Sequence, residues 1–206
     1  MPESATEWYA RVSAAIAADG YRPSNWPDWP TWPFDGELTT RPLAAPGSER
    51  PRAGGAGRDC VQCQKSRGEA AGEYVVWRDE VAMLGVPFEG SSLPFGAFLM
   101  PRRHADLSDL TREEAARLGE LLMYAERAAV DVLDIPRIQV ARWGDGVEHL
   151  HWWLMGRPTG MEQLRGTFLS HWDDLLPLPD PDATRADLEL VAARLVELAG
   201  GEVLSG

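Results

Sequence analysis

The sequence predicts an α+β fold built on an antiparallel sheet, and three observations lead to this prediction. Short strand-like segments follow one another within residues 73–100 and again within residues 137–155, as they do in meanders. One long amphipathic helix pattern separates the two groups of strands. The chain has 206 residues, of which 44% are hydrophobic and 25% charged, values typical of globular proteins.

Three segments precede the first predicted strand. Ser4 and Glu7 form a capping box that begins a helix ending at Gly20. Residues 21–36 contain three Trp-Pro pairs, and proline there excludes a helix or a central strand. We expect this arm to pack across the protein's own surface, with a partner-binding strap as the alternative. Residues 42–57 are rich in Gly, Pro, Ala and Arg and predict a mobile linker.

The first group of strands covers residues 73–78, 81–84 and 96–100, with a Gly/Ser loop at 88–94. A second capping box, Thr111 to Glu114, begins the long helix. The helix carries an apolar stripe with alternating spacings of three and four residues, which is typical of a core face. The stripe consists of Ala115, Leu118, Leu122, Ala125, Ala129 and Val132.

The second group predicts paired strands over residues 137–143 and 149–155, joined by a turn at Gly144-Asp-Gly146. A short helix is expected over 168–175. A final amphipathic helix is expected over 184–198, ending at the glycine pair that follows.

The net charge of −12 argues against a surface that binds duplex nucleic acid, because an acidic chain repels phosphate backbones. No segment approaches the length of a membrane span or has the pattern of a secretory signal. A soluble, cytoplasmic protein is therefore expected, with no membrane partner.

The histidines and cysteines form the main candidate site. On a strand, His149, His151, Trp153 and Met155 would share one face, opposite the wholly apolar Leu150, Trp152 and Leu154. Cys60 and Cys63 have the spacing of a zinc clip, for which the histidines at 104, 149, 151 and 171 could complete a tetrahedron. A redox pair and two unrelated buried cysteines remain the alternatives.

Three segments resemble the histidine-triad (HIT) proteins in order and spacing. They are CVQCQKSRGE at 60–69, FLMPRRHADLSDLT at 98–111 and HLHWWLMGRP at 149–158. The resemblance covers residues 58–158 and divides the chain into an N-terminal helix, arm and linker (1–57), a HIT-like domain (58–158) and a C-terminal helical extension (159–206). It implies an antiparallel five-stranded sheet with a long helix and a nucleotide pocket.

The resemblance also implies a chemistry. Cys60, Cys63, His104 and His149 would bind a structural Zn²⁺, as in the branch that includes the galactose-1-phosphate uridylyltransferases. His151 would attack the α-phosphorus of a nucleotide and form a nucleotidyl–histidine intermediate. A four-ligand site leaves no open position for water, so the metal would not be catalytic.

Two positions depart from the family pattern. Trp153 stands where the triad has its third histidine, and indole offers one N–H and no proton transfer. Arg142 stands near the place of a family asparagine and could hold phosphate, as could Arg157. His171 lies outside the resemblance and is expected to be an exposed or capped helix histidine.

The function that this implies is a nucleotidyl hydrolase or transferase acting on a small phosphate-linked nucleotide. The alternative is a degenerate HIT-like domain that binds a nucleotide or a protein partner without catalysis, which Trp153 favours. A redox protein that uses its two cysteines is a third, weaker hypothesis. HIT-like domains commonly pair, so a homodimer is one expectation for the oligomeric state.

Overall fold

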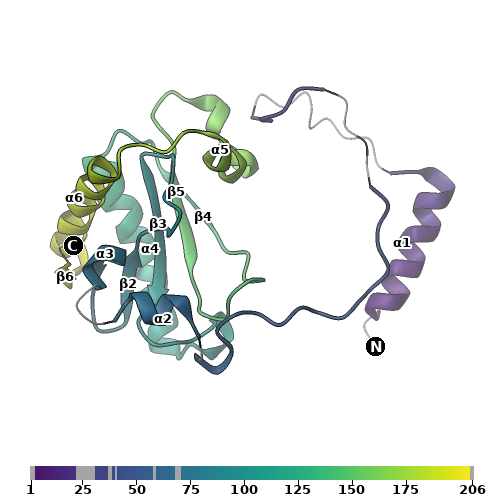
Figure 1. Ribbon diagram of the computed structural model, residues 1–206, viewed down its shortest axis with the longest axis horizontal. Helices are drawn as coiled ribbons and strands as arrows, with labels where there is room; N and C mark the ends of the chain where they lie inside the picture. Colours follow the sequence, from purple (N-terminus) through teal and green to yellow (C-terminus); the bar gives the residue numbers. More distant parts are fainter. Residues whose placement is uncertain are drawn as a thin grey trace. The chain divides into compact units, whose positions relative to one another are not determined.

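The computed structural model describes residues 3–21, 31–36, 39, 41–57, 59–67 and 71–204 (Figure 1). The chain divides into two compact units, Met1–Pro51 and Arg52–Gly206, each of which is described by itself. No helix among the described residues has both the length and the apolar character needed to cross a membrane.

The smaller unit contains α1 (Ala5–Asp19), and the predicted capping box between Ser4 and Glu7 is confirmed at its start. The Tyr21 hydroxyl donates a hydrogen bond to the carbonyl oxygen of Arg41 at 3.1 Å. Much of the Trp-Pro arm, residues 22–30, lies outside the described residues, so its packing stays a prediction.

The larger unit is built on one antiparallel sheet with the strand order β4-β5-β3-β2-β1-β6. Its strands are β1 (Val75–Arg78), β2 (Ala82–Gly85), β3 (Phe95–Pro101), β4 (Ile138–Ala141), β5 (Trp152–Gly156) and β6 (Glu202–Val203). The predicted α+β class and antiparallel sheet are confirmed. The five strands expected within residues 58–158 are β1 to β5, and β6, from the C-terminal segment outside that range, adds a sixth strand by pairing with β1 at one edge.

Gly201 makes this sixth strand sterically feasible. Its φ is +88°, and a Cβ atom there would lie 2.6 Å from the carbonyl oxygen of Arg78. The indole N–H of Trp77 donates to the carbonyl oxygen of the preceding residue, Gly200, at 2.9 Å. A larger residue than glycine would therefore push β6 away from β1.

Two long helices, α4 (Arg112–Val132) and α6 (Pro181–Ala199), pack together and cover one face of the sheet (Figure 1). The second predicted capping box, Thr111 with Glu114, is confirmed at the start of α4. The core between helices and sheet includes Leu118 and Leu121 of α4, Val191 of α6, and Leu150 and Leu154 around β5.

Shorter helices lie on the connections. They are α2 (Val61–Lys65), α3 (Ala71–Tyr74), α5 (Leu169–Leu175) and the 3-10 turns η2 (Gly55–Gly57), η3 (Leu107–Asp109), η4 (Glu162–Leu164) and η5 (Gly166–Phe168). Leu169 of α5 packs with Leu93 and Met155, beside the β5 residue Trp153. The carboxylate of Asp173, in the same helix, accepts hydrogen bonds from the 87–94 loop (2.6–3.1 Å).

Three predictions of local structure are wrong. Glu73 and Tyr74 end helix α3 instead of beginning β1. The segment 149–151 precedes β5, and residues 142–151 form a long connection in place of a tight turn. The end of the predicted mobile linker is anchored, because Ala53 exchanges backbone hydrogen bonds with Gly146 and Glu148 (2.8 and 3.0 Å). Backbone N–H and C=O groups in such segments form hydrogen bonds with residues far away in the chain, as Ala53 does, and local sequence patterns do not reveal these partners.

Candidate functional site

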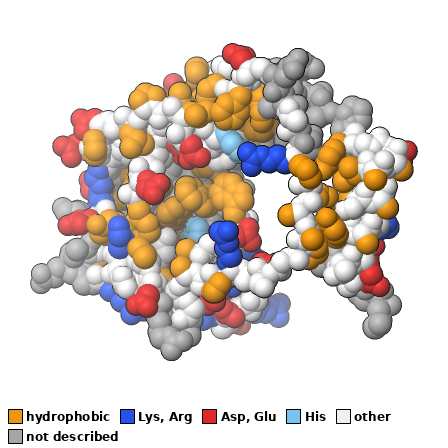
Figure 2. All heavy atoms as spheres, turned by 45° about the vertical axis from the view of Figure 1, so that its right-hand side comes forward, with side chains coloured by type: hydrophobic (Ala, Val, Ile, Leu, Met, Phe, Trp, Pro, Cys, Tyr) orange, Lys and Arg blue, Asp and Glu red, His pale blue; other side chains and the backbone are white. Residues whose placement is uncertain are grey.

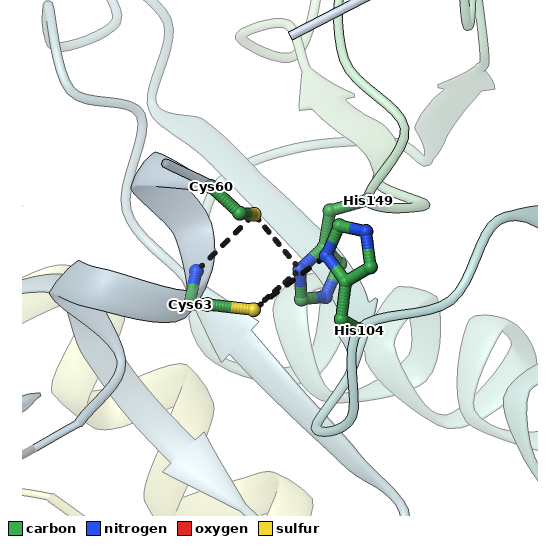
Figure 3. Close-up of side chains that lie close together, drawn as sticks. All are labelled: Cys60, Cys63, His104 and His149. Atoms are coloured by element: carbon green, nitrogen blue, oxygen red, sulfur yellow. Dashed lines mark hydrogen bonds between the residues drawn. The ribbon is translucent and has the colours of Figure 1, made fainter. Parts of the chain in front are cut away.

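Two cysteines are brought together by the short helix α2. Cys60 is its N-cap, and its Sγ atom accepts a hydrogen bond from the backbone N–H of Cys63 at 3.5 Å. Only 1% of Cys60 and 5% of Cys63 is exposed. One turn of helix thus directs both sulfur atoms to the same buried point, as Figure 3 shows.

His149 faces these sulfur atoms through Nδ1. The distances from Nδ1 to the Sγ atoms of Cys60 and Cys63 are 3.5 and 3.4 Å. Its Nε2 lies 2.9 Å from the carbonyl oxygen of Pro101. Since a carbonyl can only accept, Nε2 carries the proton and Nδ1 presents a lone pair to the sulfurs. Such a hydrogen bond fixes the ring orientation of a metal-binding histidine.

His104 completes the group, with its Nδ1 3.7 Å from the Sγ of Cys63. The four potential ligand atoms of Cys60, Cys63, His104 and His149 all lie within 4.8 Å of one another. Two glycines shape the segment before Cys60, because Gly54 and Gly57 have positive φ angles of +80° and +75°. A Cβ on Gly54 would also lie only 3.2 Å from the Cβ of Cys60.

The sulfur–nitrogen distances in this group match those expected around a tetrahedrally coordinated metal ion. Zinc bonds of about 2.3 Å to sulfur and about 2.0–2.1 Å to nitrogen place neighbouring sulfur and nitrogen ligands roughly 3.5 Å apart. The sulfur–nitrogen distances in the group are 3.4–3.7 Å. Two thiols and two imidazoles are also a donor set that zinc prefers. The residues present therefore fit a closed four-ligand site.

Burial disfavours charge on these side chains when no cation is bound. It raises the pKa of the Cys63 thiol to about 11, with a further contribution from the neighbouring Cys60. Burial likewise lowers the pKa of His149, which is 0% exposed. A bound metal cation would reverse the preference of the thiols, because it stabilises their deprotonated form.

His151 lies two residues beyond His149 and belongs to a different environment. Its Nδ1 is 2.9 Å from the carbonyl oxygen of His149, so Nδ1 carries the proton and Nε2 has the free lone pair. Leu150, between them, is buried in the core under α4. The predicted alternation of faces therefore extends into the segment before β5.

Aromatic rings surround His151. The ring of Phe98 is 5.4 Å from the His151 ring and 4.5 Å from that of Trp153, between ring centroids. Trp153 also contacts Trp143 at 5.7 Å, and 53% of Trp143 is exposed. Figure 2 shows hydrophobic side chains gathered on the surface of the larger unit, with histidine atoms at their border. Trp153 thus fills space beside His151.

Arg142 lies on the connection that leads to His151, but it is engaged elsewhere. Its guanidinium donates to the carboxylate of Asp106 at 2.6 Å, and the guanidinium of Arg52 donates to the other carboxylate oxygen at 2.5 Å. Burial alone would raise the pKa of Asp106, but the hydrogen bonds from Arg52, the Leu107 N–H and Arg142 lower it to about 2. Asp106 therefore stays a carboxylate between two arginines.

A small hollow connects this cluster with the histidines. Asp106, Arg142, His149 and His151 are among its lining residues, and it has no room for a water molecule. The structure therefore brings Arg142 and His151 to one place, in a closed arrangement.

Two sequence candidates lie elsewhere. Arg157 follows β5, at the opposite end from His151 and roughly 20 Å away along the strand. It donates to the carbonyl oxygen of Pro158 at 3.0 Å and to Glu162 at 3.3 Å, so the structure does not bring it to His151. His171 lies exposed on α5, and its ring contacts Phe168.

Sequence reasoning missed Asp106, Arg52 and Phe98. Asp106 opens a capping box of its own with Asp109, a pattern visible in the sequence. Nothing local indicated that it would hold two arginines 54 and 36 residues away. The place of Phe98 beside His151 depends on the pairing of β3 with β5.

Comparison with known proteins gives the fold a precedent. No protein-family model and no curated protein sequence matches the chain. A histidine triad nucleotide-binding protein from Sulfolobus tokodaii is 16% identical, with 68% of this chain and 97% of that chain covered and a TM-score of 0.51. This likeness confirms the predicted resemblance at the level of the fold.

Two further structures are similar over a comparable part of the chain. A zinc-bound histidine triad family protein from Mycobacterium smegmatis is 23% identical, with 68% of this chain and 94% of that chain covered and a TM-score of 0.48. A uridylyltransferase is 25% identical, with 67% and 45% covered and a TM-score of 0.47.

Proposed function

Given the histidine-triad fold of this chain, we propose that it is a nucleotidyl hydrolase or transferase with a structural zinc ion and His151 as its nucleophile. Its substrate would be a phosphate-linked nucleotide, such as a dinucleoside polyphosphate or a nucleotide sugar. The observation that carries the proposal is the hydrogen bond from His151 Nδ1 to the carbonyl oxygen of His149 (2.9 Å). It fixes the orientation of the ring and the proton on Nδ1, so that in the uncharged imidazole the lone pair is on Nε2.

A lone pair in this position suits attack on phosphorus. In the proposed first step, Nε2 of His151 bonds to the α-phosphorus, and the bond from phosphorus to the leaving-group oxygen breaks. The leaving group departs with the bonding electrons. In the second step, the oxygen of water or of an acceptor phosphate bonds to phosphorus, the P–N bond breaks, and Nε2 regains its lone pair; when water is the acceptor, the proton it loses passes to the solvent. Two such displacements are easier than a single one without an enzyme nucleophile.

The two neighbouring histidines would divide the work. The Nδ1 atom of His149 faces the cysteine sulfurs. The ring of His151 instead contacts the ring of Phe98 on β3. Zinc would supply folding energy and hold the segment before β5, since all four of its positions would be taken by protein ligands. His151 would thereby be held at a fixed place without contacting the metal.

Arg142 is the proposed phosphate ligand. Its guanidinium carries a fork of donors suited to phosphate, and it lines the same hollow as His151. To reach a substrate it would leave Asp106, whose other oxygen would still be held by Arg52. The carboxylate would not be left unpaired. Arg157 has no part in this proposed site.

Trp153 supports the alternative of a binding domain without turnover. Its ring packs edge-on against Phe98, with centroids 4.5 Å apart, on the side of His151 where the family's third histidine would stand. With no second imidazole there, protonation of the leaving group would fall to water or to the substrate itself.

Enzyme assays on the full chain separate the two functions. Hydrolysis of diadenosine tetraphosphate and of UDP-glucose would be compared for the wild type, His151→Ala and the matched control His171→Ala. We expect His151→Ala to lose activity by at least about a thousandfold while its zinc content and fold are unchanged, because no other nucleophile can replace Nε2. His171→Ala should retain activity, since His171 is exposed on α5.

Trp153→His adds a second comparison. Restoring an imidazole should raise the hydrolysis rate if a proton donor is what the site lacks. Nucleotide binding by both the wild type and His151→Ala, with equal inactivity across both substrates, would overturn the enzyme proposal and leave the binding domain.

A further inference from the structure

A cavity of about 640 Å³ lies on the larger unit between the 86–91 loop and the first half of α6. Figure 1 shows the segment from α5 to α6 passing along one end of the sheet, and this segment contributes Leu178 and Pro179 to the cavity wall. Further apolar wall comes from Val86, Pro87 and Leu188. The volume is in the range of sites for small organic molecules.

The rim of this cavity is acidic. Glu73, Glu89 and Asp182 line it with exposed side chains, and none of them forms an ion pair with a described residue. Arg185 is the single cation among the described lining residues, and it is paired with Glu189 at 2.8 Å. Its other guanidinium nitrogens donate to backbone carbonyls at 2.6 and 2.7 Å. The guanidinium of Arg185 is therefore already paired with Glu189 and two backbone carbonyls. The exposed carboxylates of Glu73, Glu89 and Asp182 have no ion-pair partner among the described residues.

Aromatic rings at the border of the cavity already hold an ammonium group. The Nζ atom of Lys65 lies 4.1 Å from the centroid of Tyr74 and 4.1 Å from that of Phe88, and both rings line the cavity. Lys65 is the one lysine in the sequence. A cation is stabilised at such a position by the negative faces of the rings. Even with Lys65 counted, the acidic groups around the cavity outnumber the cations.

We propose that this cavity binds a small organic cation, with the apolar or aromatic part of the ligand against its walls and the ammonium group at its acidic rim, which Glu73, Glu89 and Asp182 line. This site goes beyond the proposed nucleotide chemistry and does not depend on it. The ring of Phe98 stands between the cavity border and His151, with centroids 6.4 Å from Phe88 and 5.4 Å from His151.

Calorimetric titration of the full, zinc-loaded chain with three probes measures separately how the charge of the ligand and its apolar part contribute to binding. The probes are 4-phenylbutylamine, 4-phenylbutan-1-ol and 4-phenylbutyrate, which share the apolar body and carry a positive, neutral or negative end. We expect the amine to bind about tenfold more tightly than the other two, because it alone is attracted by the carboxylates of the rim that have no ion-pair partner among the described residues. Equal affinities for the three probes, or no binding of the amine, would overturn the proposal.

Variants locate the site. Glu73→Gln and Glu89→Gln should each weaken amine binding about two- to fivefold, the effect of losing one exposed ion pair. Leu178→Ala should weaken all three probes, since it removes apolar wall. Glu126→Gln makes the same charge change on the exposed surface of α4 and should leave binding unchanged. An equal loss in Glu126→Gln would show that the amine follows net charge only, which contradicts the proposal.

His151→Ala separates this site from the nucleotide proposal. Amine binding should be unchanged in this variant. Loss of amine binding in His151→Ala would refute a separate cation site, whereas retained binding in an inactive wild type would leave it standing.

Discussion

Asp106→Asn should lower the free energy of unfolding by about 2 kcal/mol at pH 7. The pKa of Asp106 is about 2 in the folded chain, against 3.8 for the unperturbed group. A difference of this size corresponds to roughly 2 kcal/mol, at about 1.4 kcal/mol per unit. The side chain of Asp106 is 12% exposed, whereas those of Arg52 and Arg142 are 31% and 28% exposed, so solvent screens the two ion pairs only in part. Asparagine keeps the shape but loses both ion pairs.

The sign of the pH dependence follows from the lowered pKa. Asp106 stabilises the folded chain fully above about pH 4, where the carboxyl is ionised in the unfolded chain too. That contribution should fall to about half near pH 3 and vanish below about pH 2. The difference between wild type and Asp106→Asn should therefore shrink in the same pH window.

Urea unfolding followed by tryptophan fluorescence at pH 7, 4 and 3 measures this difference. Asp145→Asn is the matched control, because Asp145 is exposed on the same connection as Arg142 and forms no ion pair with a described residue. The control should change stability by less than about 0.5 kcal/mol. Equal stability of Asp106→Asn and Asp145→Asn at pH 7, or a difference that does not shrink on acidification, would refute the role assigned to the two arginines.

Two further predictions concern the metal and helix α5. Metal analysis of the purified wild type should find about one zinc per chain, and Cys63→Ser should lose the metal and much of its stability, because metal binding energy is folding energy; absence of zinc in unchelated wild type would contradict the four-ligand site. Asp173→Ala should lower stability by about 1–3 kcal/mol and increase hydrogen exchange over residues 169–175, since the Ser91 hydroxyl and the Ser92 backbone N–H lose their acceptor. The neighbouring exposed Asp174→Ala should leave both quantities nearly unchanged, and equal effects of the two variants would count against this anchoring role.

The local pattern around β5 could be predicted from the sequence. Alternation places Leu150, Trp152 and Leu154 toward α4, and the structure packs these residues in the main core. The prediction fails only in where the strand begins. Residues 149–151 keep the alternation, but their backbone bonds go to other partners, such as Leu150 N–H to Ala105.

The elements that were missed depend on contacts far apart in the chain. β6 has only two residues, and it forms because Gly201 lets the chain approach β1. The 52–57 segment has a composition typical of a linker, yet Ala53 pairs with the connection before His149. Such pairings leave no local periodicity to detect.

Part of the candidate site could likewise be predicted from the sequence, and part could not. The CxxC spacing and the two histidines that join it could be read from the sequence, because each lies within a recognisable motif. The pairing of Arg142 with Asp106 could not be read from it, because the two residues are 36 positions apart and no local pattern links them. The distance of Arg157 from His151, in contrast, follows from their separation along β5.

Intact mass spectrometry tests the central claim, nucleophilic attack by His151, most directly. The full chain would be mixed with diadenosine tetraphosphate, quenched in alkali to preserve P–N bonds, and compared with His151→Ala and His171→Ala. The proposed chemistry predicts an added adenylyl group on the wild type and on His171→Ala, mapped to His151 by peptide analysis, and none on His151→Ala. An adenylyl group on another residue, or its complete absence from a wild type that hydrolyses the substrate, would contradict attack by His151.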